Sequence, residues 1–264
     1  MKQKNVTIGL LNLVAIKEVF ENQMRDILTS SLFENYNINL VLLKIDSYTP
    51  RNSSEEYMNA KYTSWKDAKY DMLIITGAPL ELVPYVNIKY LDELHEVFNK
   101  AIKEQLPTMF SCWSVNAFLR YRYNIDHQLT PHKLSGVFSH KIVNNSYVNY
   151  NLRDPIRAPV SKFTDIDKSL FTEDKFTIIM EYHDQLKDRV GIALDKNYPF
   201  FYMLSHFEYY KERLRNEYYV DINKGRNPVI PKHYFLDNDV NSEIIYNWQE
   251  NCNQIFYNWV SHYF

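Results

Sequence analysis

The sequence predicts an α/β fold in which helices cover both faces of a central, mostly parallel sheet. Short apolar runs alternate with segments of helical period through the first half of the chain. Such alternation is typical of parallel sheets buried on both faces. In addition, 45% of the 264 residues are hydrophobic, which is enough for one sizeable core. We find no repeat, low-complexity segment or Pro/Gly-rich linker, so we expect a single domain over residues 1–264.

The elements of the first half follow from the spacing of apolar residues. In Leu91–Ile102, for example, the apolar residues recur at helical spacing and mark one buried face. By the same reasoning the expected strands are 6–13, 39–45, 70–76 and 107–112, and the expected helices are 17–32, 91–102 and 114–123.

The second half is more mixed. The segments "KFTIIMEYH", "RVGIALDK" and "PFFYMLSH" indicate three successive strands, partly antiparallel. Leu214–Ile222 and Val240–Val260 are expected to be helical. Within the latter, Cys252 lies among apolar residues and is expected to be structural.

Charge and composition exclude several functions. The net charge of −2, with mixed signs along the chain, gives no basic field for a nucleic acid, and the apolar runs are too short to span a membrane. Two distant cysteines argue for a reducing cytoplasm and against a disulfide framework. The histidines show no metal-ligand spacing, so we expect no metal site.

One cysteine occupies a position where ligands bind in open parallel sheets, beyond the carboxyl ends of the strands. Gly77, Cys112 and His206 each end an expected strand and could converge on one crevice. A cysteine between a strand and a helix could be a buried apolar residue. It could equally be a nucleophile, because the helix N-terminus favours a thiolate there.

A nucleophilic thiol needs a base, and the base needs an orienting carboxylate. His206 and Glu208 offer both, since residues i and i+2 share one side of an extended segment. The backbone N–H of Trp113 and one in the Gly77–Leu80 turn, at Ala78, are the expected oxyanion donors.

Several motifs in order resemble the homoserine O-acyltransferase family of the transsuccinylase type, which has a class I glutamine amidotransferase-like, flavodoxin-like fold. The similarity runs from Val6 to Phe264. Its motifs are "IGLLNL", "ENQ", "ITGAPLELV", "CWSVNAFL", "KLSGVF", "HFEYY", "HYFLDND" and "IFYNWVSHYF". The resemblance implies that Cys112 carries an acyl thioester, His206 accepts the proton and Glu208 is its partner. It also implies acyl-CoA as a substrate, no bound cofactor and a homodimer.

The same resemblance bears on the acyl donor. At the position of Glu81, glycine in the family goes with succinyl-CoA and glutamate with acetyl-CoA. A glutamate there fills the space of a succinyl tail and repels its carboxylate. We therefore expect acetyl-CoA as the donor, with homoserine O-succinyltransferase activity as the alternative.

The expected acceptor site departs from the family pattern. Lys133 and Ser161 match the substrate-contacting lysine and serine, but Lys162 stands where arginine is usual, and Val220 falls on the family's substrate-binding arginine. Lys162 and Arg215 are candidates to replace that arginine. A changed carboxylate clamp fits an acceptor one methylene shorter than homoserine, so we expect L-serine or L-homoserine, leaning to serine.

Two alternatives of other classes stay open. One is a Cys-His-Glu hydrolase, glutaminase-like, in which water takes the acyl group; Glu81 and Lys133 argue against it. The other is a binding paralogue with an altered pocket. The intact Cys112, His206 and Glu208 argue against it, and Val220 leaves it open.

Overall fold

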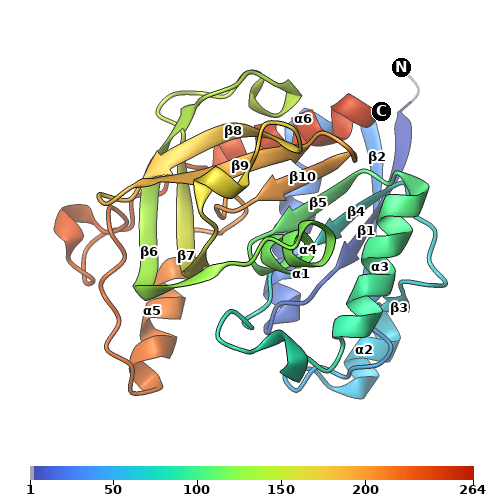
Figure 1. Cartoon of the computed structure of the whole chain (residues 1–264), viewed down its shortest axis with the longest axis horizontal. Coiled ribbons are helices and arrows are strands. Elements are labelled where there is room, and N and C mark those ends of the chain that lie inside the picture. Colours follow the sequence, from blue (N-terminus) through green and yellow to red (C-terminus); the bar gives the residue numbers. More distant parts are fainter. Residues whose placement is uncertain (1–2) are drawn as a thin grey trace.

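A ten-stranded sheet runs through the molecule, as seen in a computed structural model that describes residues 3–264 (Figure 1). Its order is β3-β2-β1-β4-β5-β10-β9-β8-β6-β7. Neighbours from β3 to β10 are parallel, and neighbours from β10 to β7 are antiparallel. The parallel strands are β1 (Lys4–Leu11), β2 (Tyr36–Lys44), β3 (Thr63–Ser64), β4 (Met72–Ile75), β5 (Thr108–Ser111) and β10 (Phe200–Met203). The others are β6 (Gln128–Ile142), β7 (Arg157–Asp165), β8 (Phe176–His183) and β9 (Asp188–Asp195).

Helices lie on both faces of the parallel part, which confirms the predicted fold class. Figure 1 shows α3 (Leu91–Glu104) and α4 (Trp113–Tyr123) in front of the sheet, and α1 (Lys17–Leu28) and α6 (Gln249–Tyr263) behind it. Helix α2 (Glu55–Lys61) lies beside β3, and α5 (Arg213–Asn223) lies below β6 and β7 in that view. Short 3-10 turns occupy Ser31–Phe33, Tyr85–Asn87, Tyr147–Asn149, Lys168–Leu170 and Leu236–Asn238.

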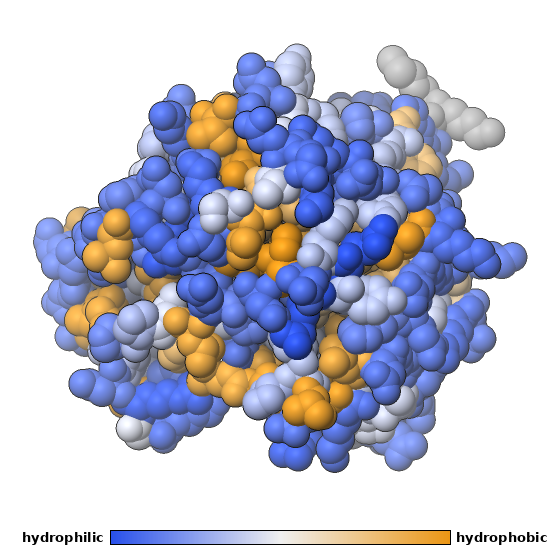
Figure 2. Space-filling view, in the orientation of Figure 1, coloured by the Kyte–Doolittle hydropathy of each residue, from blue (hydrophilic) through white to orange (hydrophobic). Residues whose placement is uncertain are grey.

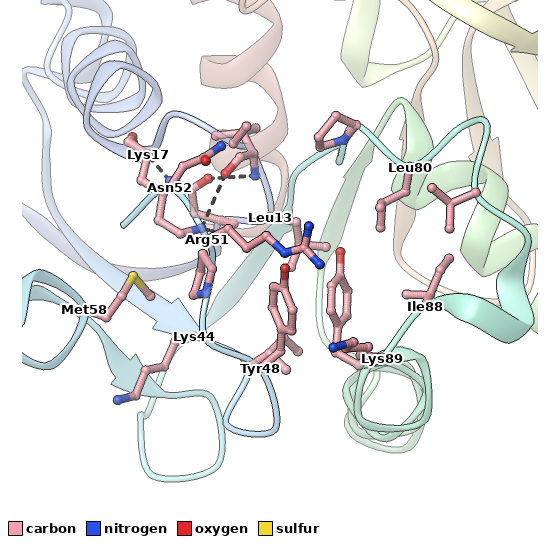
Figure 3. Close-up of a pocket in the computed structure, with 18 of the residues that line it drawn as sticks. Leu13, Lys17, Lys44, Tyr48, Arg51, Asn52, Met58, Leu80, Ile88 and Lys89 are labelled. Atoms are coloured by element: carbon pink, nitrogen blue, oxygen red, sulfur yellow. Dashed lines mark hydrogen bonds between the residues drawn. The ribbon is translucent and has the colours of Figure 1, made fainter. Parts of the chain in front are cut away.

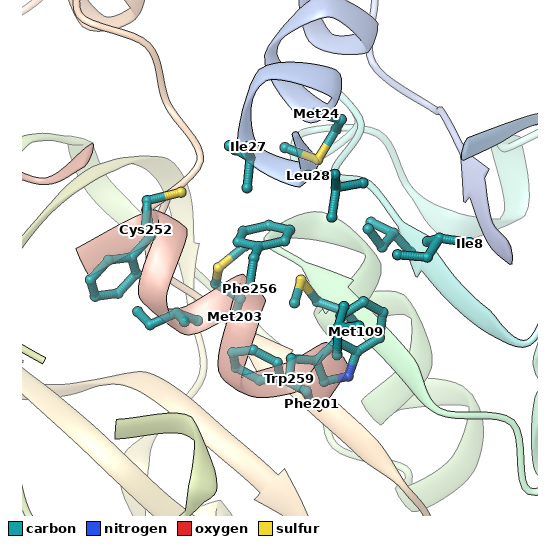
Figure 4. Close-up of a cluster of buried hydrophobic side chains, with 14 of the residues drawn as sticks. Ile8, Met24, Ile27, Leu28, Met109, Phe201, Met203, Cys252, Phe256 and Trp259 are labelled. Atoms are coloured by element: carbon teal, nitrogen blue, oxygen red, sulfur yellow. The ribbon is translucent and has the colours of Figure 1, made fainter. Parts of the chain in front are cut away.

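The sheet separates two large apolar clusters, because successive side chains of a strand point to opposite faces. In β1, Ile8 and Leu10 pack against α1 and α6, whereas Leu11 packs with the α3 and α4 side. Figure 4 shows the first cluster, in which Cys252 and Phe256 of α6 lie among methionine and leucine side chains. Cys252 is fully buried there, so its place agrees with the structural role expected of it.

Polar side chains cover most of the face in view, and apolar ones form small separate groups (Figure 2). Among residues 3–264, no helix is both long enough and apolar enough to cross a membrane.

Three expectations about single elements are wrong. The helix expected over 17–32 ends at Leu28 and passes into a 3-10 turn. The helix expected over 240–260 begins only at Gln249, because the chain turns back after Leu236 and Ile244 forms an antiparallel bridge with Phe235 instead. The pattern also missed β6 and β7, a long antiparallel pair that faces α5 and contains Lys133 and Ser161.

Candidate active site

Cys112 lies on a sharp turn between β5 and α4. Its φ of 52° and ψ of −114° are unusual for a residue other than glycine, and such a backbone costs about 1–3 kcal/mol. The turn is held by hydrogen bonds on both sides. The Cys112 N–H donates to the Met203 carbonyl at 2.9 Å, and the Ser111 N–H donates to the Ser114 hydroxyl at 3.0 Å. The Ser114 hydroxyl in turn donates to the Ile75 carbonyl at 2.8 Å. The strain is thus fixed by β4 and β10, and the half-buried thiol stands at the start of a helix.

The turn after β4 approaches this thiol closely, and glycine allows it. A Cβ atom at Gly77 would lie 3.3 Å from the Cys112 Cβ, tighter than ordinary van der Waals contact. In the part of the chain that the structure describes, no hydrogen bond is formed by the N–H of Ala78 or of Trp113, the first residue of α4. Both expected oxyanion donors are therefore available beside the thiol.

His206 and Glu208 lie next to Cys112 and are buried, with 6% and 3% of their surface exposed. The His206 Nδ1 lies 2.8 Å from the Glu208 Oε1, and the Ser111 hydroxyl donates to the same oxygen at 3.2 Å. The contact was predicted, but the reason given for it was wrong. Strand β10 ends at Met203, and residues 206–209 form a turn in which the Tyr209 N–H donates to the His206 carbonyl.

The charges around His206 decide its protonation. Burial alone would lower its pKa, but the Glu208 carboxylate and the nearby Cys112 sulfur raise it to about 10. The Tyr209 ring stacks on the imidazole, with centroids 4.1 Å apart. At neutral pH the ring is therefore an imidazolium, which supplies the counter-charge that a thiolate needs.

Glu81 comes from the loop after β4 and is anchored to β7. Its carboxylate accepts from the Phe163 N–H at 3.2 Å and from the Thr164 hydroxyl at 2.9 Å. Burial raises its pKa, and hydrogen bonds and the charges of Lys162 and His206 partly offset that rise. The side chain is thus a fixed carboxyl group near the predicted base.

Lys133 and Ser161, the predicted acceptor contacts, meet on neighbouring strands and share one carboxylate. The Lys133 Nζ lies 3.5 Å from Glu217 and 3.0 Å from Asp221, and the Ser161 hydroxyl donates to Glu217. Tyr209 donates to the other Glu217 oxygen at 3.0 Å. Burial opposes ionisation of Glu217, but Lys133 and its other partners lower the pKa of Glu217, so it is charged.

Glu217 and Asp221 were missed by sequence reasoning. Their spacing of four residues in an amphipathic helix was the available signal, because i and i+4 lie on one helix face. An acidic pair on the buried face of a helix needs cations opposite it. Lys133 is one such cation, and Arg213 and Arg226 are others, at 2.8 Å and 2.7 Å.

The two departures from the family pattern lie in different surroundings. Val220 is 47% exposed on α5, and its side chain carries no charge that could replace the family's arginine. Lys162 is buried, and although burial alone would lower its pKa, Tyr182, Asp165 and Cys112 raise it. The backbone N–H of Arg215, the other candidate, donates to the hydroxyl of Tyr234. Tyr234 belongs to a separate apolar cluster.

Within residues 3–264, no group of three or more His, Cys, Asp and Glu side chains is placed to hold a metal ion.

A parallel sheet with a cysteine elbow at the end of a central strand, and a His-Glu pair beyond the next strand, defines the class I glutamine amidotransferase-like fold. Solved structures agree. A glutamine amidotransferase from Thermotoga maritima superposes with a TM-score of 0.63, at 12% identity and with 97% of each chain covered. A glutamine amidotransferase from Methylobacillus flagellatus gives 0.59, at 9% identity, with 98% of this chain and 95% of that chain covered.

The sequence comparisons narrow this class to one family. The family model described as homoserine O-succinyltransferase matches residues 2–264, and the chain belongs to this family. A homoserine O-acetyltransferase of Methanomethylophilus alvi is 33% identical over 96% of this chain and 82% of its own. A homoserine O-succinyltransferase of Alteromonas mediterranea is 34% identical over 97% and 82%. The chain is therefore an acyltransferase, and its relatives include both acetyl- and succinyltransferases.

Proposed function

We propose that the protein transfers an acetyl group from acetyl-CoA to the side-chain hydroxyl of a small amino acid, L-serine or L-homoserine, through a thioester on Cys112. Such a product would feed cysteine or methionine synthesis. The observation that carries the proposal is the position of His206, which contacts Glu208 and lies close enough to Cys112 for the two groups' charges to interact. Beside them are two backbone N–H groups that have no partner among the described residues.

The first half-reaction forms the acyl-enzyme. The Cys112 thiolate attacks the thioester carbonyl, and the oxyanion is bound by the N–H groups of Ala78 and Trp113. The C–S bond to CoA breaks, and the His206 imidazolium gives its proton to the departing sulfur. Exchange of one thioester for another is nearly balanced in energy, so the protein supplies mainly positioning and oxyanion binding.

The second half-reaction uses the neutral imidazole that the first has left. His206 takes the proton of the acceptor hydroxyl as the oxygen attacks the acyl carbon, and the Cys112 thiolate leaves. Glu208 stabilises the imidazolium that forms again. Because CoA leaves before the amino acid reacts, the kinetics are expected to be ping-pong.

Glu81 supports acetyl rather than succinyl transfer. Its carboxyl group is held to β7 by two hydrogen bonds, which would have to break for the side chain to make room for a longer acyl tail. A succinyl carboxylate would meet a second carboxyl group in a confined site. The relatives do not choose between donors, since both kinds are about equally identical to this chain.

Lys162 is the better candidate to bind the acceptor's carboxylate. It is a buried cation whose charge acts on Cys112 and on Glu81, so it lies near both expected partners of the reaction. The cation that binds the acceptor's carboxylate would then come from β7 instead of α5. This change in position fits a shorter acceptor and favours L-serine over L-homoserine. The Tyr209 ring stacks on His206, and its hydroxyl donates to Glu217, which also accepts from Ser161. The Glu217 carboxylate would bind the acceptor's amine there.

The experiment that tests this function compares CoA release from acetyl-CoA with L-serine, with L-homoserine and with no acceptor. We expect release to be stimulated by serine, and by homoserine to a smaller degree. Rapid release without any acceptor would favour the hydrolase alternative. No acetylation of Cys112 at all would favour the binding paralogue.

Three further features of this proposal stay predictions. The resemblance implies a homodimer and catalysis without a resident cofactor, and the two distant cysteines indicate a cytoplasmic location.

A further inference from the structure

A cavity of about 430 Å³ lies at the carboxyl ends of β1, β2 and β4 (Figure 3). Its walls include Leu13 after β1, Lys44 at the end of β2 and Leu80 after β4. Strand β1 pairs with β2 on one side and with β4 on the other. The chain therefore adds strands toward one side of β1 first and toward the other side afterwards, so the strand order reverses here. In open α/β sheets this switch point is where ligands bind. The predicted acyl-transfer residues do not line it.

The cavity wall is positively charged. Lys17, Lys44, Arg51 and Lys89 line it, and none of the described residues in its wall is acidic. Within residues 3–264, Arg51 and Lys89 are exposed and form no ion pair or side-chain hydrogen bond. Figure 3 shows the Arg51 side chain reaching over the cavity toward Tyr48. Unpaired cations around a hollow attract anions, and planar guanidinium groups suit phosphates especially.

Two other features fit a nucleotide. Helix α1 begins with Lys17 at the cavity, and its N-cap Ile16 offers no side-chain hydrogen bond, so no side chain of the cap occupies the N–H groups of the first turn. The acidic residue of that turn, Glu18, does not line the cavity. Tyr48 and Tyr90 bring two aromatic rings to the wall, with centroids 5.3 Å apart. Rings of this kind stack on nucleobases.

The cavity is also joined to the thiol. Pro79 and Leu80 line it, and the same loop places Gly77 against Cys112. Strands β1, β4 and β5 are consecutive in the sheet, so the end of β1 is roughly 10 Å from that of β5. A long ligand could have one end in the cavity and the other at Cys112.

We propose that this cavity binds the nucleotide and phosphate end of the acyl-CoA donor, with Arg51 and Lys89 holding phosphates and the thioester arm crossing the Ala78–Leu80 loop to Cys112. The proposal rests on the acyl-CoA chemistry above and adds the site that recognises the donor.

The test compares two acetyl donors, acetyl-CoA and acetyl-pantetheine, which lacks the nucleotide and its phosphates. Rates of acetylation of Cys112 are measured by intact mass for the full chain and for Arg51→Glu/Lys89→Glu. A matched control, Lys69→Glu/Lys103→Glu, reverses two exposed lysines that precede β4 and β5, toward the amino ends of these strands. We expect the cavity variant to react with acetyl-CoA at least about tenfold more slowly, and with acetyl-pantetheine at the unchanged rate. The control should be unchanged with both.

An unchanged rate with acetyl-CoA would overturn the proposal, as would an equal loss with both donors. Calorimetric titration of each variant with free CoA measures binding at the cavity separately from acetylation of Cys112. If the unaltered chain binds CoA, the cavity variant binds it about tenfold more weakly and no adduct forms, then the cavity site stands and the acyl-transfer proposal fails. If the unaltered chain does not bind CoA, the cavity proposal is wrong.

Discussion

Replacing Glu208 with Gln should slow acetylation of Cys112 by about 10²-fold. The change keeps the shape of the side chain and its hydrogen bond to His206 but removes the negative charge. Glu208 is 3% exposed, and in the structure its Oε1 lies 2.8 Å from the His206 Nδ1. Without that charge, the imidazolium loses its largest stabilising partner and the thiolate loses its counter-charge.

The magnitude follows from the pKa of His206. The surroundings raise it from 6.5 to about 10, which corresponds to about 5 kcal/mol of preference for the imidazolium. Glu208 and Cys112 share this preference. Half of it, about 2–3 kcal/mol, corresponds to roughly 10²-fold in rate.

The assay is single-turnover acetylation, quenched and followed by intact mass. Ser111→Ala is the matched control, because it removes the other hydrogen bond to Glu208 and leaves its charge. We expect a loss below about tenfold for that control. A Glu208→Gln rate within threefold of the unaltered chain would refute the argument that the carboxylate holds the charge on His206.

Other predictions concern the donor, the acceptor and pH. Glu81→Gly should raise the rate with succinyl-CoA relative to acetyl-CoA by about tenfold or more, since it removes both bulk and charge; an unchanged donor ratio would exclude Glu81 as the selector. Glu217→Gln should raise the acceptor KM by about tenfold and leave acetylation of Cys112 unchanged, since Glu217 binds Lys133 and Ser161 but does not contact the thiol; slowed acetylation would contradict this division. The pKa of His206 is raised by folding, so its contribution to the free energy of unfolding is full below about pH 6.5 and is lost as pH rises through about 10. Cys112→Ala should lower the titration midpoint of the imidazole seen by NMR, and an unmoved midpoint would show that sulfur and ring do not interact.

The first half of the fold could be predicted because its strands are buried on both faces. Met72–Ile75 and Thr108–Ser111 are fully buried runs between amphipathic helices, and the apolar pattern shows such strands directly. Strands β6 and β7 gave no such signal. Their polar residues face a charged site on α5 rather than a core, so Lys133 and Ser161 interrupt the apolar alternation.

The site was predictable to the extent that it lies at strand ends. Cys112, His206 and Gly77 are brought together by the order of β4, β5 and β10. The sequence could not show that His206 sits on a turn, or that Glu217 lies beside Ser161, because those contacts depend on how α5 packs against the antiparallel strands. The cavity at β1 was missed because Arg51 and Lys89 belong to loops without a motif.

Intact mass after mixing with acetyl-CoA alone is the most direct measurement of the central proposal, that Cys112 carries the acyl group. We predict an increase of about 42 Da in the mass of the chain, located on the Cys112 peptide after digestion, that disappears when L-serine is added. An unchanged mass under single-turnover conditions, or the same adduct on Cys112→Ala, would contradict it.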